Sequence, residues 1–463
     1  MTKTKHFKKT ILAGALGASM SITSWAAPLE KELNTLLSTH PLLKAAAYTV
    51  DSAESSKDAA VAGYAPRLFV DATYGKEYIE NRAYDDPERV TNDSVKGDIS
   101  TAKTDYSSGT LRIEQPLLHF GRISSAVDAA ESGLRAQEFE YEQATQRILL
   151  EGITAYLQVG RYVTLIELAK QNEASTKEQL DLESKRVDAG GGIEVDALQA
   201  KTRLQVVRER SVFYRQQLRD VLATYEQLFG RTPELSTIQD VGIPLELIPD
   251  DTESAITEYM KLNPSVNSAF AAADQAFAQI GISDASILPK IDAVGRANAE
   301  RTKNSTYSKD EWSVGLRFSW TLSLGGEELH RAKASLSSHD ASLQQAVAAQ
   351  NNFKQQVRTS WNQVENGQER LELLADAVEI SKSVMQDRKR LRDAGKETAL
   401  AALDAEVEYY GVLANKVNAE FDTRIAAYRL LAALGALSPE KLGLPEGKLA
   451  VPVSTLVTDA DQI

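Results

Sequence analysis

The chain has 463 residues, 25% charged and 43% hydrophobic, which is the composition of a folded protein and excludes a disordered one. Its net charge of −13 argues against general nucleic-acid binding, which needs a basic surface. Without cysteine it has no disulfides, thiolate nucleophiles or cysteine-ligated metals, and its five scattered histidines lack the spacing of a helical zinc site.

Residues 1–27 have the pattern of a secretory signal peptide. Four lysines precede the apolar run 11–22, and small residues around Ala26 and Ala27 suit signal peptidase, so cleavage is expected after one of these alanines. Removal of the four lysines brings the net charge to −17. No later apolar run is long enough for a transmembrane helix, so insertion of the mature chain would require a β-barrel.

The mature chain reads as two copies of one unit. The first copy covers residues 28–230 and the second 254–435; a linker, 231–253, joins them, and a tail, 436–463, follows. The repeated landmarks are His40-Pro41 with Asn263-Pro264, Ala65-Pro66 with Leu288-Pro289, and Asp188-Ala189-Gly190 with Asp393-Ala394-Gly395. The first copy is longer by about 18 residues, which fall in a polar, acidic loop at 79–107 that we expect outside the cell.

Each copy is predicted to run helix, strand, loop, strand, long helix, turn, helix. In the first copy, one helix covers about 28–63, and Pro66 ends it. A β-hairpin follows at 66–118, because apolar and polar residues alternate from Leu68 to Tyr74 and again around Leu111, before Pro116 closes the second strand.

The segment after this hairpin predicts a very long helix. Residues 122–187 contain no proline and would span about 100 Å as a helix. Beyond a tip near 187–195, apolar residues recur at heptad spacing up to Leu228, which is typical of coiled coils, although an ordinary bundle helix has a similar pattern.

The second copy repeats this layout, with a hairpin at 289–322 and a tip near 393–400. One strand of its hairpin places an apolar face opposite a polar one. Such a face, with tryptophan at both ends, suits a lipid-facing strand with aromatic girdles, while a sheet packed on a soluble core is the alternative. The members of the apolar face are Trp312, Val314, Leu316, Phe318 and Trp320.

These elements predict an oligomer. Four strands with one apolar face cannot close a barrel, and their unpaired edges are unacceptable in lipid. Helices this long and thin also need neighbours to bury their apolar seams. A cyclic assembly with a shared barrel continued by a helical cylinder satisfies both needs. The expected fold is therefore mixed and mainly α: a long coiled-coil barrel plus four strands per chain.

Over nearly its whole mature length the chain resembles the TolC family of outer-membrane efflux and export proteins. The resemblance rests on the duplicated layout, on the turn motifs at 186–200 and 392–405, and on the strand-to-helix motif at 116–121. It implies a homotrimer with a 12-stranded outer-membrane barrel and a periplasmic helical barrel. It also implies docking to a periplasmic adaptor and to an ABC or proton-driven transporter of the inner membrane, with no cofactor and no metal.

The same resemblance implies roles for residues at the tips. The adaptor would contact the turns, and the candidates are Gly190, Gly192, Leu198, Gly395 and Leu403. The alternative is that these glycines only form turns and these leucines only pack the coil.

Some family members carry aspartate rings that narrow the entrance. Asp404 and Asp196 are the matching candidates, whereas Ala401 departs from the pattern and leaves a single ring in the second copy. Three converging carboxylates repel one another and favour a cation between them. The alternative is that both aspartates are solvated on the helix surface.

Other function classes fit the sequence less well than an export duct. An enzyme is not expected, because the phosphate-loop, GxGxxG and GxSxG motifs are missing from the sequence. An extended coiled-coil scaffold or adhesin is disfavoured by the matched strands. For the cargo, the lack of an N-terminal cysteine for lipid attachment favours type I protein secretion, and a multidrug efflux pump is the alternative.

Overall fold

The computed structural model describes residues 27–82, 99–191, 193–238, 241–242, 247–303, 308–442 and 444. The expected signal peptide up to residue 26, the middle of the expected outer loop and most of the tail lie outside these ranges. The chain divides into two compact units. We call them the helical unit (Met1–Asp51, Arg135–Phe270, Gln344–Ile463) and the sheet unit (Ser52–Leu134, Ala271–Leu343).

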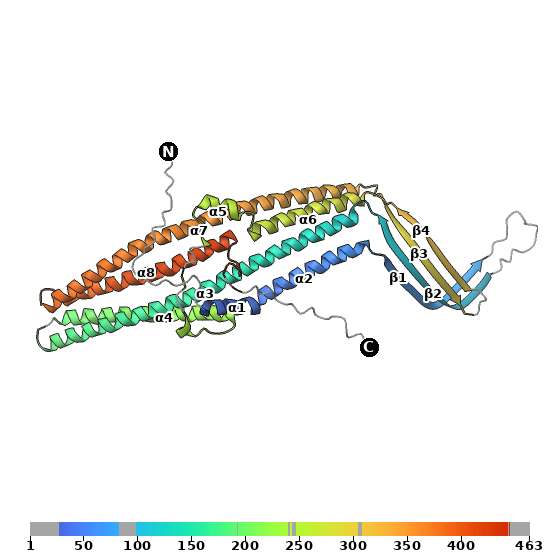
Figure 1. Ribbon diagram of the computed structural model, residues 1–463. Helices are drawn as coiled ribbons and strands as arrows, with labels where there is room; N and C mark the ends of the chain where they lie inside the picture. Colours follow the sequence, from blue (N-terminus) through green and yellow to red (C-terminus); the bar gives the residue numbers. More distant parts are fainter. Residues whose placement is uncertain are drawn as a thin grey trace, which may run out of the picture. The chain divides into compact units, whose positions relative to one another are not determined.

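The helices and strands repeat in the order predicted, except that two helices instead of one precede each hairpin (Figure 1). The two long helices have 67 residues each, and the two that follow them have 36 each, in agreement with duplication of one unit. The first copy consists of α1 (Ala27–Thr39), α2 (Pro41–Val61), η1 (Ala62–Tyr64), β1 (Arg67–Arg82), β2 (Ile99–Leu118), α3 (Arg122–Asp188) and α4 (Glu194–Phe229). The remainder consists of η3 (Leu235–Thr237), α5 (Thr252–Tyr259), α6 (Pro264–Ser286), β3 (Lys290–Thr302), β4 (Ser308–Ser319), α7 (Glu327–Asp393) and α8 (Ala399–Leu434).

The single first helix that we expected is in fact two, α1 and α2, because the chain breaks at His40-Pro41. Pro41 has no N–H, so it suits the first position of a new helix. His40 caps that helix, since its Nδ1 accepts a hydrogen bond from the Leu42 N–H at 3.3 Å. Asn263 has the same position before α6, where its Oδ1 accepts from Ser265 and Val266 at 3.0 and 3.2 Å.

This difference between the caps predicts a pH effect. Burial lowers the pKa of His40, with the nearby Arg147 adding to it and Glu151 opposing it. A lowered pKa in the fold means that stability is present above pH about 6.5, the unfolded value, and is lost as the pH falls. We expect His40→Asn, which copies Asn263, to keep the cap and lose less thermal stability between pH 7 and 5. Thermal unfolding of both proteins measures this difference. An equal loss of stability between pH 7 and 5 would contradict a pH-dependent cap at His40.

The four strands form one antiparallel sheet in the order β1-β2-β3-β4. Two predictions about the first hairpin were wrong. The expected loop at 79–107 is partly strand, because Ile79 pairs with Ala102 and the ladder continues to Arg82 and Ile99. Pro116 does not close β2, since a register shift between Pro116 and Leu118 lets the strand continue past it.

The core of the helical unit lies where α1 packs with the middle of α3 and the C-terminal half of α8. Leu33, Leu149 and Leu431 are each at most 1% exposed there. Gly152 allows a close approach, because a Cβ at this position would come within 2.5 Å of a Leu36 methyl group. This core holds α1, the middle of α3 and the C-terminal part of α8 together.

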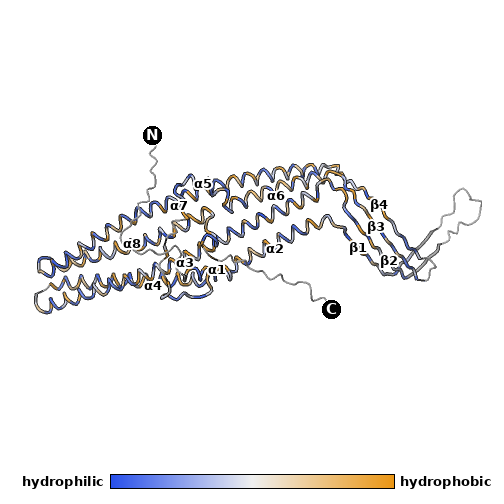
Figure 2. Tube along the Cα trace, in the orientation of Figure 1, coloured by the Kyte–Doolittle hydropathy of each residue, from blue (hydrophilic) through white to orange (hydrophobic). Residues whose placement is uncertain are grey.

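Apolar and polar residues are interspersed along the long helices (Figure 2). Within the described ranges, none of the helices combines the length and apolarity needed to cross a bilayer.

Candidate functional site

One face of the sheet is apolar and open to its surroundings. The register places Leu68, Ile113, Gly295 and Val314 in one row across the four strands, and Val70, Leu111, Ala297 and Trp312 in the next. Along β4, Trp312, Val314, Leu316 and Phe318 are between 63% and 81% exposed. Trp320 follows the strand and anchors it, because its indole N–H donates to the Ile287 carbonyl at 3.0 Å. An apolar surface of this extent needs a partner, either lipid or protein.

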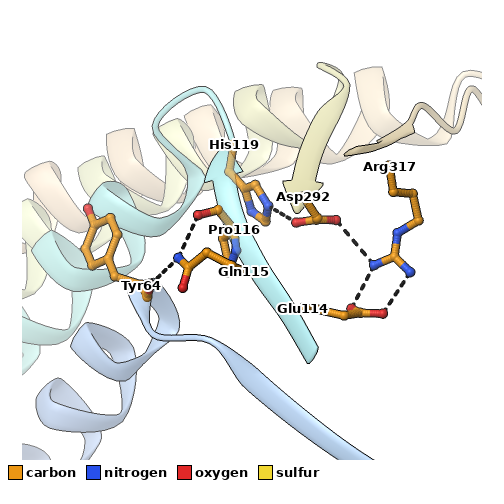
Figure 3. A network of polar contacts seen from close by, with 7 residues as sticks. All are labelled: Tyr64, Glu114, Gln115, Pro116, His119, Asp292 and Arg317. Atoms are coloured by element: carbon orange, nitrogen blue, oxygen red, sulfur yellow. Dashed lines mark hydrogen bonds and ion pairs between the residues drawn. The ribbon is translucent and has the colours of Figure 1, made fainter. Parts of the chain in front are cut away.

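The opposite face of the sheet carries a cluster of charges at its helix-proximal end (Figure 3). Arg317 binds both carboxylate oxygens of Glu114, each at 2.7 Å, and reaches Asp292 at 3.4 Å. His119 contacts Asp292 from the other side at 2.8 Å. These contacts join β2, β3 and β4 at the place where β2 gives way to α3.

The strand-to-helix motif at 116–121 explains how His119 reaches this cluster. After the shift at Pro116, Phe120 has φ 49° and Gly121 has φ 86°. Two successive left-handed residues reverse the chain sharply and let α3 begin at Arg122. The motif at 116–121 therefore forms the turn between β2 and α3.

Both hairpin tips belong to the helical unit and end α3 and α7 in the same way. Gly190 has φ 76° and Gly395 has φ 68°, and in each case the next N–H donates to a carbonyl five residues back, at 3.0 and 2.9 Å. This is the glycine-dependent Schellman end of a helix. The turn-forming role of both glycines is therefore plain, while Gly192 lies outside the described residues.

The two tip leucines differ in accessibility. Leu198 is 56% exposed, whereas Leu403 is 1% exposed and packs inside the tip of the second copy. A partner can therefore contact the Leu198 side chain, but the Leu403 side chain is not accessible to one in this structure.

Asp404 has an ion-pair partner within the same chain. Its Oδ1 accepts a hydrogen bond from Arg203 of α4 at 2.8 Å, and the two side chains are 51% and 42% exposed. Asp196 is half-buried in the first turn of α4. The Arg203 guanidinium therefore neutralises much of the charge that Asp404 would offer to a cation. In the described part of the chain, no three His, Asp or Glu side chains gather closely enough to hold a metal ion.

A buried polar cluster joins the tip of the second copy to α3. Glu406 of α8 is 1% exposed, accepts a hydrogen bond from Gln179 and pairs with Lys389 at 3.2 Å. Arg392 donates to the same Gln179 at 3.0 Å. Burial, with the Glu406 charge adding to it, raises the pKa of Tyr410 one turn further along α8.

Sequence reasoning missed both charge clusters. Their members lie far apart in the chain, since Gln179 and Glu406 are separated by 227 residues and His119 and Asp292 by 173. The alternation that identified the apolar face did place Arg317 on the opposite face, but it gave no partner.

Comparisons with known proteins agree with this architecture. The family model "Outer membrane efflux protein" matches residues 33–231 and 255–436. The alkaline protease secretion protein AprF of Pseudomonas aeruginosa is 25% identical over 385 residues, which cover 79% of this chain and 77% of AprF. The outer membrane protein TolC of Vibrio cholerae is 22% identical over 445 residues, 94% of this chain and 97% of TolC.

Among solved structures, the outer-membrane channel OprN superposes with a TM-score of 0.76 at 20% identity, covering 88% of this chain and 90% of OprN. This likeness shows the fold, and the resemblance to the TolC family drawn from the sequence is confirmed. The chain belongs to the outer membrane efflux protein family, and it is an outer-membrane channel protein.

Proposed function

We propose that three copies of this chain form one export channel, in which each copy contributes its four strands to a shared 12-stranded β-barrel. The open apolar face of the sheet carries this proposal, because it matches the lipid-facing band of outer-membrane barrels. The outer edges of β1 and β4 also need partners in lipid. Since β1 and β4 run in opposite directions, β4 of one copy can pair antiparallel with β1 of the next.

In this channel the long helices would form a tunnel in the periplasm, and the tips would dock with an adaptor that links the channel to an inner-membrane transporter. Leu198 is available for such docking, because its apolar side chain is exposed at the tip that contains the Gly190 turn. The transporter would be an ABC or proton-driven protein.

The cargo that we propose is protein, secreted by a type I system. The support is the likeness to AprF, whose name describes secretion of a protease. Efflux of small toxic compounds is the alternative, favoured by the description of the matched family.

A deletion strain separates the two cargoes. Loss of a large protein from the culture medium, with drug susceptibility unchanged, is the expected result. A strain that secretes the same proteins but becomes drug-sensitive would move the assignment to efflux. Complementation with the wild-type gene controls for effects on neighbouring genes.

For the gate, we predict opposite effects from the two partners of one ion pair. Asp404→Ala should weaken the block of single-channel current by divalent cations severalfold, because it removes a carboxylate from the entrance. Arg203→Gln should strengthen the same block, because it frees the Asp404 carboxylate from its partner. Asp196→Ala tests the first copy in the same assay. Unchanged block in both Asp404→Ala and Arg203→Gln would remove Asp404 from the gate.

A further inference from the structure

A hollow of about 370 Å³ lies within the sheet unit, where α2 gives way to β1 and β2 gives way to α3. Its wall includes the charged side chains Arg67, Arg122, Lys290, Glu114 and Asp292. The small residues Ala59 and Gly63 leave the space open on the side of α2 and η1.

The two carboxylates in this wall are already neutralised. Glu114 pairs with Arg317 at 2.7 Å and with Arg112 at 3.3 Å, and Asp292 contacts both His119 and Arg317. The wall itself carries three cationic side chains and two carboxylates. With Arg112 and Arg317, which pair with these carboxylates but do not line the hollow, the cluster has five cations and a net charge of +3, His119 not counted.

The excess charge belongs to Arg67, Arg122 and Lys290. All three are exposed, and none of them is within salt-bridge distance of a carboxylate among the residues that the structure describes. Cations that share a hollow and have no salt-bridge partners of their own repel one another, so an anion between them lowers the electrostatic energy of the site. Guanidinium groups also match the planar fork of a carboxylate or phosphate.

The backbone adds to the same field. Arg122 and Ile123, the first residues of α3, line the hollow. The start of a 67-residue helix carries a partial positive charge and N–H groups that attract anions. The start of α3 and the cationic side chains therefore both favour an anion in the hollow.

We propose that this hollow binds the anionic oxygens of cargo, as carboxylate or phosphate groups, on their way through the channel. Arg67 and Lys290 lie on the polar face of the sheet, opposite the apolar row of Leu68 and Val314. If the apolar face meets lipid, the polar face lines the conduit, so the inference rests on the proposed function. In a trimer these three residues would supply nine cations in all. Together they would form a basic collar where the barrel meets the helices.

Binding of inorganic tripolyphosphate to the full chain in detergent, measured by calorimetry, tests the hollow directly. The triple variant Arg67→Gln, Arg122→Gln, Lys290→Gln should bind at least about tenfold more weakly, since each charge-assisted contact contributes substantially to affinity. The charge-preserving variant Arg67→Lys, Arg122→Lys, Lys290→Arg should retain most of the affinity. Lys76→Gln, on the opposite face of the sheet, should bind like the wild type.

Single-channel recording supplies the second arm. Tripolyphosphate and a short glutamate peptide should each reduce the current of the wild type, and half-blocking concentrations should rise about tenfold in the triple glutamine variant. Block by the peptide alone would assign the collar to acidic segments of a polypeptide, and block by tripolyphosphate alone to phosphate groups.

The two assays also separate this inference from the proposed function. Equal tripolyphosphate binding by the wild type and the triple glutamine variant would overturn the collar, even if both conduct. A chain that binds tripolyphosphate in the predicted order but never conducts would leave the anion site standing and contradict the channel.

Discussion

Leu316→Arg should prevent stable insertion of the channel into the outer membrane. Leu316 is 73% exposed on the apolar face, midway between Trp312 and Trp320. An arginine facing lipid near the bilayer midplane costs about 2–4 kcal/mol per chain. Three copies raise this to roughly 6–12 kcal/mol per trimer, comparable with the whole stability of a folded domain.

The measurement is the yield of detergent-resistant trimer in the outer-membrane fraction, which should fall at least tenfold. Thr110→Arg is the matched control, because it adds the same charge on the polar face, opposite Asp71 in the β1–β2 register. It should assemble like the wild type. Equal assembly of both variants would mean that this face of the sheet does not meet lipid.

Lys389→Met should loosen the tip of the second copy. The substitution removes the ammonium group that lies 3.2 Å from the buried Glu406 carboxylate. Lys389 is 30% exposed, so the loss of stability should lie between the values for breaking a surface ion pair and a buried one. We expect a loss of about 2 kcal/mol. Amide hydrogen exchange in the first turns of α8 should become about thirtyfold faster.

A second substitution identifies the cause. Glu406→Gln on the Lys389→Met background removes the unpaired charge and still leaves an oxygen to accept from Gln179. Exchange should then return most of the way to the wild-type rate. If the double variant exchanges as fast as Lys389→Met alone, loss of packing rather than the unpaired carboxylate controls the tip.

The helices and the face of the sheet could be predicted from the sequence because their signals are local. The absence of proline after Arg122 and the glycine at 190 define α3 to within one residue. Alternation from Trp312 to Phe318 defines the exposed face of β4. The outer parts of β1 and β2 gave no such signal, since polar residues occupy both faces there and only pairing between the strands makes them regular.

The pairings between distant residues could not be predicted. Arg203 and Asp404 are 201 residues apart, and their contact depends on how α4 and α8 lie along each other. A shift of either helix by one residue turns its side chains by about 100° and breaks the pair. The aspartate was therefore found as a gate candidate from the sequence, while the arginine that neutralises it was found only in the structure.

We propose that three chains combine their strands into one closed barrel. Cryo-electron microscopy of the full-length protein in lipid nanodiscs tests it most directly. We expect three copies around one axis, 12 strands, and β4 of each copy paired with β1 of the next. A monomer, a different number of copies, or sheets whose β1 and β4 edges remain unpaired in the bilayer would contradict it.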